Sequence, residues 1–340
     1  MSHPDRPALS IIIPAHNTAS TVGRLLESVC RQTAPGDEVI VVDDASTDDT
    51  VRVAADFPVR LERLSRRSGP AAARNRGAAL ARRAILVFFD ADVVLHADTL
   101  SRGAARMGGP SVDAVIGSYD DAPHVRTLVS QFKNLAHHHT HQQAGGRVGT
   151  FWGACGFIRR SAFERAGGFD EKRFSRPSIE DLDLGWRLVQ QSGCIVLDPL
   201  IQVTHLKAWT LGSLIKTDVI LRAVPWTRGE LARRRVPGEL NADKGQWAAG
   251  LVTLVWLGAG LSAVTGRGAV VFLLATSMAL LVNRRLFGLF WRKGGLRLLV
   301  VGFVLQQLYY LYAGVGCAIG VLLHLTGRGA ADEQSAAAEA

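Results

Sequence analysis

The sequence predicts an α/β protein with a mostly parallel sheet, followed by a membrane-associated helical region. Three observations predict this fold class. Short apolar runs alternate with helical patterns over the first 90 residues, which is typical of βαβ units. The run Ala84–Phe89 is apolar throughout, like a strand buried on both faces of a parallel sheet. Long apolar stretches then replace the mixed pattern from Ala248 onward.

The predicted elements follow from these patterns in chain order. Strands are expected over Leu9–Ile13 (broken by Pro14), Glu38–Val42, Val59–Leu64 and Ala84–Phe89, and helices over Thr21–Gln32, Thr47–Ala55 and Gly69–Ala81. Further along, helices are expected over Arg126–Gln143, Ser161–Ala166 and from Ile179, with a loop over Thr150–Phe157. The predicted organisation is a globular domain (1–205), an amphipathic basic juxtamembrane region (206–247), a transmembrane region (248–325) and a disordered tail (326–340).

The positive charge is concentrated outside the globular part. Residues through His205 contain 24 Lys and Arg against 23 Asp and Glu, whereas Leu206–Arg297 contains 14 against 4. The net charge of +9 therefore belongs to the region beside and between the apolar stretches. This distribution favours anionic membrane lipids as the partner and argues against nucleic acid.

Three apolar segments predict membrane spans: Ala248–Val264, Ala269–Val282 and Leu298–Leu325. Between the last two lie five basic residues: Arg284, Arg285, Arg292, Lys293 and Arg297. By the positive-inside rule this loop is cytoplasmic, and so is the Arg-rich stretch Arg228–Lys244. The prediction is a multi-pass inner-membrane protein with a cytoplasmic globular domain and an external C-terminus. In the alternative, the second segment is buried or re-entrant, which leaves two spans and reverses the C-terminus.

The remaining sequence features argue against a signal peptide, paired cysteines and a zinc site. Met1–Pro7 is polar and Leu9–Ile13 is short, so no signal peptide is expected. The cysteines Cys30, Cys155, Cys194 and Cys317 are scattered, which predicts unpaired thiols in or near the core. The histidines of the run His137–His141 have no further ligands at zinc spacing. They are expected to line an acceptor site or to lie against the membrane.

Polar side chains follow three of the predicted strands. His16 and Asn17 follow the first strand, Asp43 and Asp44 the second, and Asp90-Ala91-Asp92 the fourth. Open α/β sheets bind ligands at the carboxyl ends of their strands. Paired carboxylates there suit a hard divalent cation that bridges to phosphates, although acidic pairs also simply end strands. No GxGxxG follows the first strand, which argues against an ordinary dinucleotide fold.

The order of six motifs resembles that of family 2 glycosyltransferases with the GT-A fold, over about Leu9 to His205. These motifs are Pro14-Ala15-His16-Asn17, Asp43-Asp44-Ala45-Ser46, Ala73-Arg74-Asn75, Asp90-Ala91-Asp92, Gly167-Gly168-Phe169-Asp170-Glu171 and Glu180-Asp181-Leu182-Asp183. The resemblance implies an inverting transferase that uses a nucleotide-diphosphate sugar. It also implies donor-binding roles for Pro14, His16, Asn17, Asp43, Asp44, Arg74 and Asp90.

The same resemblance implies a metal site. Asp92 is the expected direct ligand, Asp90 contacts ribose or the metal through water, and His205 supplies a third ligand. The cofactor is then Mn²⁺ or Mg²⁺, and imidazole ligation favours Mn²⁺. The alternatives are an exposed salt bridge for Arg74 and a local hydrogen bond for His205.

Asp181 is the candidate general base, because a carboxylate near the acceptor hydroxyl can take its proton during attack. Glu180 and Asp183 flank it and are the other candidates. Trp152, Gly153 and Trp186 are candidates for acceptor binding, with packing as the alternative for both tryptophans. The segment Arg222–Trp226 does not match the QxxRW of processive synthases.

The acceptor is expected to be a lipid-linked or membrane-associated glycan at the cytoplasmic face, in the biosynthesis of an envelope polysaccharide or glycolipid. Lys207–Glu239 is basic and amphipathic, as in a helix that lies in the membrane interface. One alternative is a polyprenyl-phosphate glycosyltransferase similar to dolichyl-phosphate mannosyltransferase. A more remote one is a non-catalytic membrane scaffold that keeps a nucleotide pocket.

Overall fold

The computed structural model describes residues 6–109, 111–232, 244–264, 266 and 268–327. Within them the chain forms two compact units. Among the described residues, the first unit comprises 6–109, 111–125 and 140–207, and the second comprises 126–139, 208–232, 244–264, 266 and 268–327. Residues 328–340 of the predicted disordered tail and most of the Arg-rich stretch before the first apolar helix lie outside the described residues.

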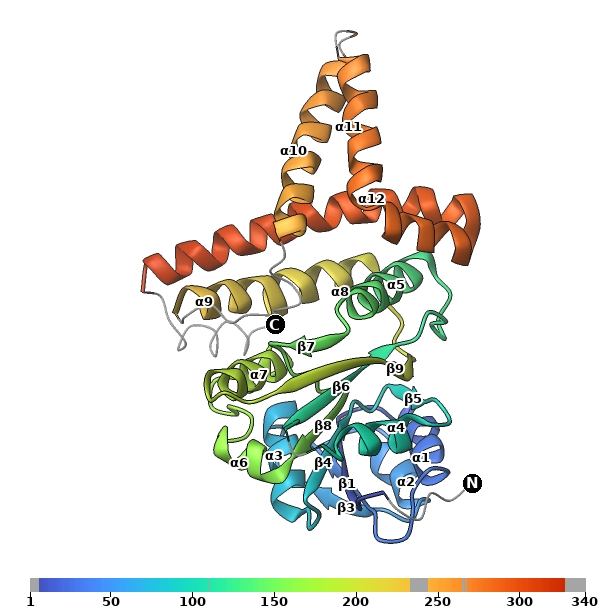
Figure 1. The fold of residues 1–340 in the computed structure, drawn as a ribbon, viewed down its shortest axis with the longest axis vertical. Helices are drawn as coiled ribbons and strands as arrows, with labels where there is room; N and C mark the ends of the chain where they lie inside the picture. The colour runs from blue at the N-terminus through green and yellow to red at the C-terminus, as the bar shows by residue number, and fades with distance from the viewer. Residues whose placement is uncertain (1–5, 110, 233–243, 265, 267, 328–340) are drawn as a thin grey trace. The chain divides into compact units, whose positions relative to one another are not determined.

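The first unit contains a nine-stranded mixed sheet (Figure 1). Its strands are β1 (Leu9–Ala15), β2 (Glu38–Asp43), β3 (Arg60–Arg63), β4 (Ile85–Phe89), β5 (Val93–Leu95), β6 (Ala114–Tyr119), β7 (Gly146–Val148), β8 (Cys155–Arg159) and β9 (Ile195–His205). The strand order is β3-β2-β1-β4-β8-β6-β9-β5, with β7 paired to β9. The strands from β3 to β4 are parallel, as predicted, and β8 is antiparallel to both of its neighbours.

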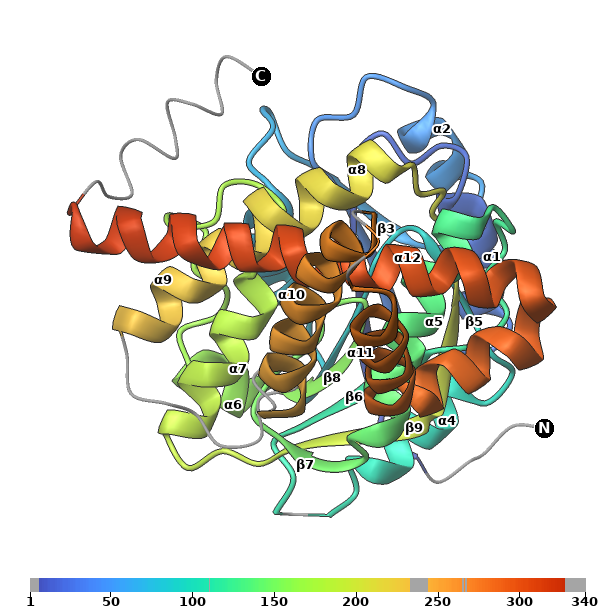
Figure 2. The same ribbon diagram turned by 90° about the horizontal axis from the view of Figure 1, so that it is seen from above.

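Helices cover this sheet on both faces (Figure 2). They are α1 (Val22–Cys30), α2 (Thr50–Ala55), α3 (Pro70–Leu80), α4 (Thr99–Arg106), α6 (Arg160–Arg165) and α7 (Glu180–Gln190). The core between sheet and helices is built from the aliphatic residues that the sequence pattern placed inside, such as Ile11, Leu25, Val41 and Val87, all fully buried. The α/β class is therefore confirmed.

Two local predictions were wrong. Pro14 does not break the first strand, because β1 continues to Ala15 in register with β2. Strand β4 pairs with β1 only as far as Ile12. Beyond that point no strand on that side needs the backbone N–H that Pro14 lacks. The expected loop Thr150–Phe157 ends at Cys155, where β8 begins. Gly156 allows this pairing, since a Cβ there would lie 2.4 Å from the Phe151 ring.

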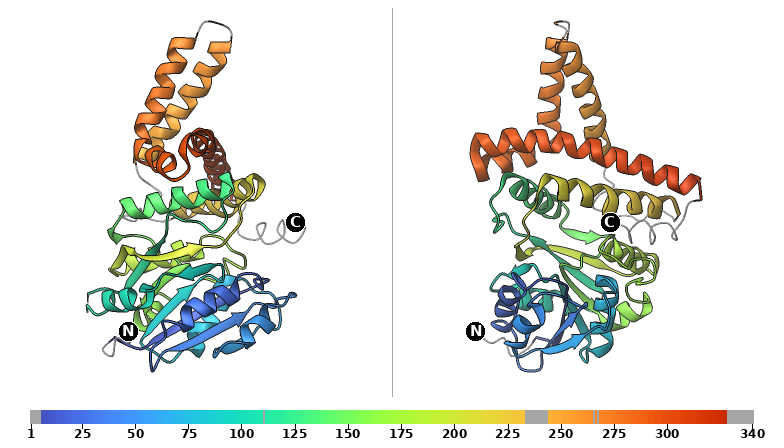
Figure 3. Two further views of the ribbon diagram at one scale, coloured as in Figure 1. Left: turned by 90° about the vertical axis from the view of Figure 1, so that its right-hand side faces the viewer. Right: turned by 180° about the vertical axis from the view of Figure 1, so that it is seen from behind.

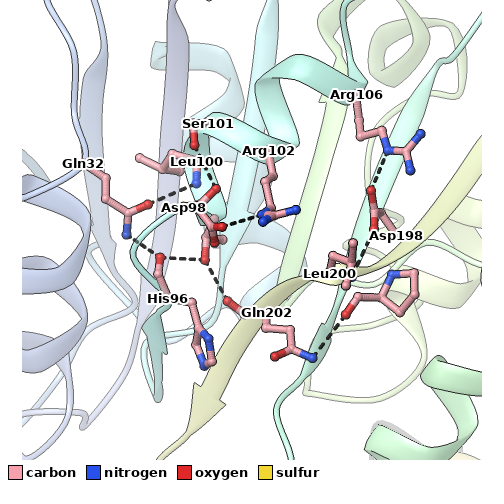
Figure 4. Close-up of polar contacts among 12 residues, drawn as sticks. Gln32, His96, Asp98, Leu100, Ser101, Arg102, Arg106, Asp198, Leu200 and Gln202 are labelled. Carbon is pink, nitrogen blue, oxygen red and sulfur yellow. Dashed lines mark hydrogen bonds and ion pairs between the residues drawn. The ribbon is translucent and has the colours of Figure 1, made fainter. Parts of the chain in front are cut away.

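A polar network fixes α4 between the ends of α1 and β9 (Figure 4). The Gln32 amide donates to the His96 carbonyl and accepts from the Leu100 N–H. Arg106 forms an ion pair with Asp198. These contacts tie α4 to the end of α1 and to β9, next to the antiparallel pairing of β5 with β9.

The second unit is helical. Helix α5 (Leu128–Gln143) begins in it and ends in the first unit; α8 (Leu211–Lys216), the π-helix η1 (Thr217–Ala223) and α9 (Val224–Ala232) follow. The apolar residues Phe132, Leu135, Trp209, Leu214 and Phe290 share one buried cluster. Through this shared core Arg126–His139 belongs to the second unit, whereas the sequence predicts it within the globular domain.

The three predicted apolar segments are helices: α10 (Lys244–Val264), α11 (Ala269–Val282) and α12 (Arg284–Leu325). Helices α10 and α11 lie side by side and α12 crosses their base (Figure 3). Among the described helices, Gly245–Val264 and α12 have the length and hydropathy needed to cross a bilayer, whereas α11 is shorter. Such a count is weak support for membrane association. All four cysteines are free, as predicted.

Candidate active site

The carboxyl ends of β1 and β2 form the first wall of the site. Asp43 and Asp44 are buried, and each is held by backbone N–H groups. The Asp43 carboxylate accepts from Ser46 N and lies 3.3 Å from Arg63 Nε. The Asp44 oxygens accept from Ser68 N at 2.6 Å and Gly69 N at 2.8 Å. Asp44 therefore ties the end of β2 to the loop that precedes α3.

His16 and Asn17 hold the same edge together. His16 Nδ1 lies 2.8 Å from the Asp44 carbonyl oxygen, and the Asn17 side-chain oxygen accepts from Thr47 N at 2.8 Å. Asn17 has a φ of 51°, a left-handed conformation that Asn tolerates better than most residues. Both side chains thus shape the loop that carries Asp43 and Asp44. Their direct contact with a nucleotide stays a prediction.

The Asp90-Ala91-Asp92 pair lies between β4 and β5, beside the end of β9. Antiparallel pairing of β5 with β9 places Val93 opposite His205. His205 Nε2 consequently lies 3.6 Å from Asp92 Oδ2. Burial alone would raise the pKa of Asp92. The close contact with His205 and the positive charges of His205 and Lys207 outweigh burial, and they hold that pKa below its usual value. The pKa of Asp90 is raised instead, by burial and by the charge of Asp92.

Aromatic rings orient His205. The Tyr119 ring stacks on the imidazole at 4.3 Å with an interplanar angle of 14°. Trp152 packs edge-on against Tyr119, and His141 packs edge-on against Trp152, each at 4.8 Å. His141 is buried and its Nδ1 lies 3.0 Å from the Gly117 carbonyl oxygen. Of the residues in the histidine run, His141 thus supports the site indirectly. The rings of Trp152, Tyr119 and His205 lie between it and Asp92.

Arg74 connects the DxD segment with α7. Its Nη2 donates to Asp90 at 2.6 Å and its Nη1 to Glu180 at 2.8 Å, and the guanidinium lies over the Phe169 ring. The side chain is only 5% exposed, so it is not the exposed salt bridge considered from the sequence. Its predicted contact with the donor diphosphate stays a prediction, since both amino groups already hold carboxylates.

The three acidic residues at the start of α7 have different environments. Glu180 is buried against Arg74, and Asp183 is paired with Arg187 at 2.8 Å. Asp181 accepts hydrogen bonds from Gly153 N at 3.1 Å and Leu182 N at 2.8 Å. Among the described side chains, no cation forms an ion pair with Asp181. Burial and the charge of Glu180 raise the pKa of Asp181 to about 6.

Two glycines allow the elements around Asp181 to approach closely. A Cβ on Gly185 would lie 2.2 Å from Phe151 N, so α7 packs directly on the backbone of the 150–153 loop. A Cβ on Gly153 would lie 3.0 Å from the Arg74 guanidinium. Gly153 therefore has a structural role beside its predicted acceptor role. Trp186 is 1% exposed and belongs to the core, which favours packing over stacking on an acceptor sugar. Trp152 is partly exposed.

The potential metal ligands of Asp92 and His205 suit a divalent cation. A carboxylate oxygen and an imidazole nitrogen lie together at the ends of adjacent strands, and the Tyr119 ring fixes the imidazole. Asp90 is engaged by Arg74, and among the described residues no group of three His, Cys, Asp or Glu side chains is arranged so that it could hold a metal ion. These two ligands would leave the other coordination positions to phosphate oxygens and water, as is usual for phosphate-bound cations.

Sequence reasoning missed Tyr119 and the partners of Arg74. Tyr119 ends β6, a strand that the sequence patterns do not predict. Glu180 is 106 residues from Arg74, and no local periodicity reports such a contact. Gly117-Ser118-Tyr119-Asp120, a small and polar stretch after an apolar run, is the one signal that resembles the other strand ends.

A mixed sheet with acidic strand ends, a DxD segment and an acidic helix start defines a nucleotide-diphospho-sugar transferase domain of the GT-A type. Comparison with known proteins agrees, because the family model "Glycosyl transferase family 2" matches residues 10–167. This part of the chain therefore resembles that family.

Two curated relatives illustrate the similarity. Glycosyltransferase AglE of Haloferax volcanii is 36% identical over 121 residues, which cover 34% of this chain and 40% of AglE. The pre-mycofactocin glycosyltransferase of Mycobacterium tuberculosis is 32% identical over 221 residues, covering 60% of this chain and 44% of that protein. The chain thus spans less than half of the length of these relatives.

A solved structure extends the similarity of fold. The mannosyltransferase PcManGT from Pyrobaculum calidifontis, in complex with GDP-Man and Mn²⁺, matches with a TM-score of 0.57 and 20% sequence identity. The match covers 93% of this chain and 88% of PcManGT. At this identity it supports the GT-A fold alone.

Proposed function

We propose that the protein is an inverting glycosyltransferase that moves a sugar from a nucleotide-diphosphate donor to a hydroxyl of a lipid-linked or membrane-associated acceptor. The observation that carries this proposal is the environment of the Asp181 carboxylate. Asp181 is a half-buried carboxylate with a pKa of about 6, and it has no ion-pair partner among the described residues. A base of that pKa is mostly ionised at pH 7 and can still accept a proton.

The donor side rests on the strand ends. Asp43 and Asp44 would accept hydrogen bonds from the base and ribose, and Asp92 and His205 would hold a divalent cation, Mn²⁺ or Mg²⁺. Such a cation, when bound, neutralises negative charge on the departing diphosphate. PcManGT, which shares the fold, was crystallised with a nucleotide-diphosphate sugar and Mn²⁺, and this supports the same ligand class here.

The acceptor side rests on Asp181 and its neighbours. The acceptor oxygen attacks the anomeric carbon from the face opposite the nucleotide diphosphate and forms the new glycosidic bond. The bond from the anomeric carbon to the diphosphate oxygen breaks with its electron pair, and Asp181 takes the hydroxyl proton. A single displacement of this kind inverts the anomeric configuration. Glu180 and Asp183, both ion-paired, then act as positioning residues for the start of α7.

The raised pKa of Asp181 also favours a hydroxyl over a polyprenyl phosphate as the acceptor. A phosphate monoester is already ionised at neutral pH and has no proton to lose before attack. A hydroxyl group needs a base, and a carboxylate raised to about 6 is suited to that role. The apolar α10 and α11 support an acceptor at a membrane, which we propose to be the cytoplasmic face of the inner membrane.

A donor panel tests the proposal. The purified chain is offered a set of nucleotide sugars with native lipid extract, and products are identified by mass spectrometry. The expected product is a glycosylated lipid of inverted configuration that depends on Mn²⁺ or Mg²⁺. Asp181→Asn should abolish it, and the exposed Asp49→Asn serves as the matched control. Full turnover by Asp181→Asn with bound nucleotide would instead point to an acceptor that needs no base.

A further inference from the structure

Helix α12 consists of two segments rather than one long rod. Gly294 and Gly295 have non-helical backbone angles, and Gly295 has a φ of 60°, which favours glycine. A Cβ on Gly302 would lie 2.5 Å from the Phe290 ring. In a continuous helix these two residues would be about 18 Å apart along the axis. The segment 284–293 is therefore folded back on the segment that begins at Leu296.

The second segment, 296–325, runs beside η1 and α9 in the same direction. Tyr312 donates to Asp218 at 2.9 Å. One and two turns further along, a Cβ on Gly316 would lie 2.7 Å from Ala223, and one on Gly320 would lie 2.7 Å from Thr227. The glycines thus allow close contact over about 12 Å of helix. Because the two helices advance together, they share one orientation.

That orientation cannot be across a bilayer. Five ionisable residues occur within 15 positions of η1, α9 and the last residue of α8: Lys216, Asp218, Arg222, Arg228 and Glu230. Charged side chains at the centre of a transmembrane helix strongly disfavour its insertion. A helix with this content lies at the surface, and the segment 296–325 beside it therefore lies there as well.

The two faces of this segment agree with an in-plane position. Its inner face buries polar side chains, including Gln306, Gln307 and Tyr312. Its outer face is apolar and exposed at regular helical spacing: Val300 53%, Val304 53%, Val315 57% and Ile319 40%. A helix with such faces settles at the boundary between headgroups and acyl chains.

The hairpin of α10 and α11 has the surface expected inside a bilayer. Trp256 Nε1 donates to Thr276 Oγ1 between the helices, and Ala275 and Ala279 are buried. The outward residues are apolar, with Leu251 66% and Leu261 74% exposed. Exposed basic residues follow the hairpin at its base: Arg284, Arg285, Arg292, Lys293 and Arg297. Their charge complements anionic headgroups.

We propose that the α10–α11 hairpin is the membrane-inserted part of the described chain, in a bilayer that contains anionic phospholipid, and that 296–325 lies in the plane of its surface. The hairpin returns the chain to the side from which it entered. The first unit joins α8 through the short stretch Lys207–Thr210, without an intervening span. Leu325 therefore ends on the same side as the first unit, contrary to the predicted external C-terminus. The proposal goes beyond the transferase function and does not depend on it.

Depth measurements along the helices test the proposal. Spin labels are attached to the full-length chain at Val300→Cys, Val304→Cys, Val315→Cys or Ile319→Cys, after Cys30, Cys194 and Cys317 are replaced by Ser and the buried Cys155 by Ala. The protein is reconstituted in vesicles of phosphatidylethanolamine and phosphatidylglycerol. An in-plane helix gives one shallow depth at all four sites. A spanning helix gives a spread of about 28 Å between positions 300 and 319, which would overturn the proposal.

Labels on α10 supply the matched comparison. Leu251→Cys and Leu261→Cys are ten residues apart, so depth should change by up to about 15 Å between them if the hairpin is inserted. Lipid-inaccessible labels at both sites, with short distances between copies by pulsed spectroscopy, would show that the hairpin pairs with a second copy. That result would overturn the proposal.

The side of the C-terminus is tested without relying on the cysteine-free background. A reporter that is active only outside the cytoplasm is fused after the last residue of the natural sequence, and a second fusion carries a cytoplasmic fluorescent reporter. We expect fluorescence and no external activity. As a further check, now in the cysteine-free background, Thr326→Cys and the exposed Ala55→Cys should react with impermeant maleimide from the same side of sealed vesicles. Reaction from opposite sides would refute the in-plane arrangement even if the protein has no transferase activity.

Discussion

The protonation of Asp181 leads to the sharpest prediction. Burial and Glu180 raise its pKa from 3.8 to about 6. The ionised base then makes up roughly 90% of the protein at pH 7 and roughly 10% at pH 5. The rate of transfer should therefore fall about tenfold per pH unit below pH 6. In Asp181→Asn the amide still accepts from Gly153 N, but kcat should fall by about 10²–10⁴ and the acidic limb should disappear.

The same pKa shift predicts a change in stability with a definite sign. Between about pH 4 and pH 6 the unfolded chain has released the Asp181 proton while the folded chain still holds it. Folded stability therefore falls as the pH rises through this window, by at most about 3 kcal/mol and by less because Asp181 is only partly buried. The Asn variant lacks this penalty. At pH 7.5 it should be at least as stable as the natural protein.

Two assays decide this prediction. Initial rates of nucleotide-diphosphate release are measured from pH 4.5 to 8, and urea unfolding is measured at pH 5 and pH 7.5. The reasoning would be refuted by Asp181→Asn turnover within a few fold of the natural protein. An acidic limb near pH 4 would equally refute it. Equal destabilisation of the variant at both pH values would indicate a structural role for Asp181.

Three further predictions concern the surroundings of Asp181. Arg74→Met leaves Glu180 buried without its cation and should lower the unfolding free energy by about 3–5 kcal/mol in urea titrations. A loss below about 1 kcal/mol, as expected for an exposed ion pair, would contradict the buried geometry. Gly69→Ala forces a Cβ to within 2.2 Å of the Ser175 oxygen at a φ of 90°, so it should lose more than about 1 kcal/mol, and an unchanged melting temperature would be inconsistent with this contact. Asp92→Asn should weaken Mn²⁺ binding at least tenfold by calorimetry while unfolding is unchanged; equal Mn²⁺ affinity would remove Asp92 from the ligand set.

The sequence was sufficient for the parts of the fold that local patterns record. The apolar run that became β4 and the alternation that became β1 to α3 determine their own structure by burial and periodicity. The in-plane orientation proposed for α12 could not be predicted from the sequence, because hydropathy depends on composition and does not report how a helix is oriented. Gly294-Gly295 was visible in the sequence, but only the contact of Phe290 with Gly302 shows that the chain turns back there.

The candidate site divides along the same line. The proximity of Asp92 to His205 depends on pairing between β5 and β9, and the sequence indicated it only through a family resemblance. The sequence singled out Glu180, Asp181 and Asp183 but could not rank them. The ranking depends on Arg74 and Arg187, whose positions are set by tertiary packing.

The double ion pair of Arg74 has a consequence for the order of events in the site. One guanidinium holds both Asp90 and Glu180, and the charges of Arg74, Asp90 and Glu180 all act on Asp181. In the proposed mechanism, a nucleotide sugar that drew Asp90 away from Arg74 would change the electrostatic field at Asp181 without touching it. Binding of the donor and the protonation of Asp181 would then be coupled before the acceptor arrives.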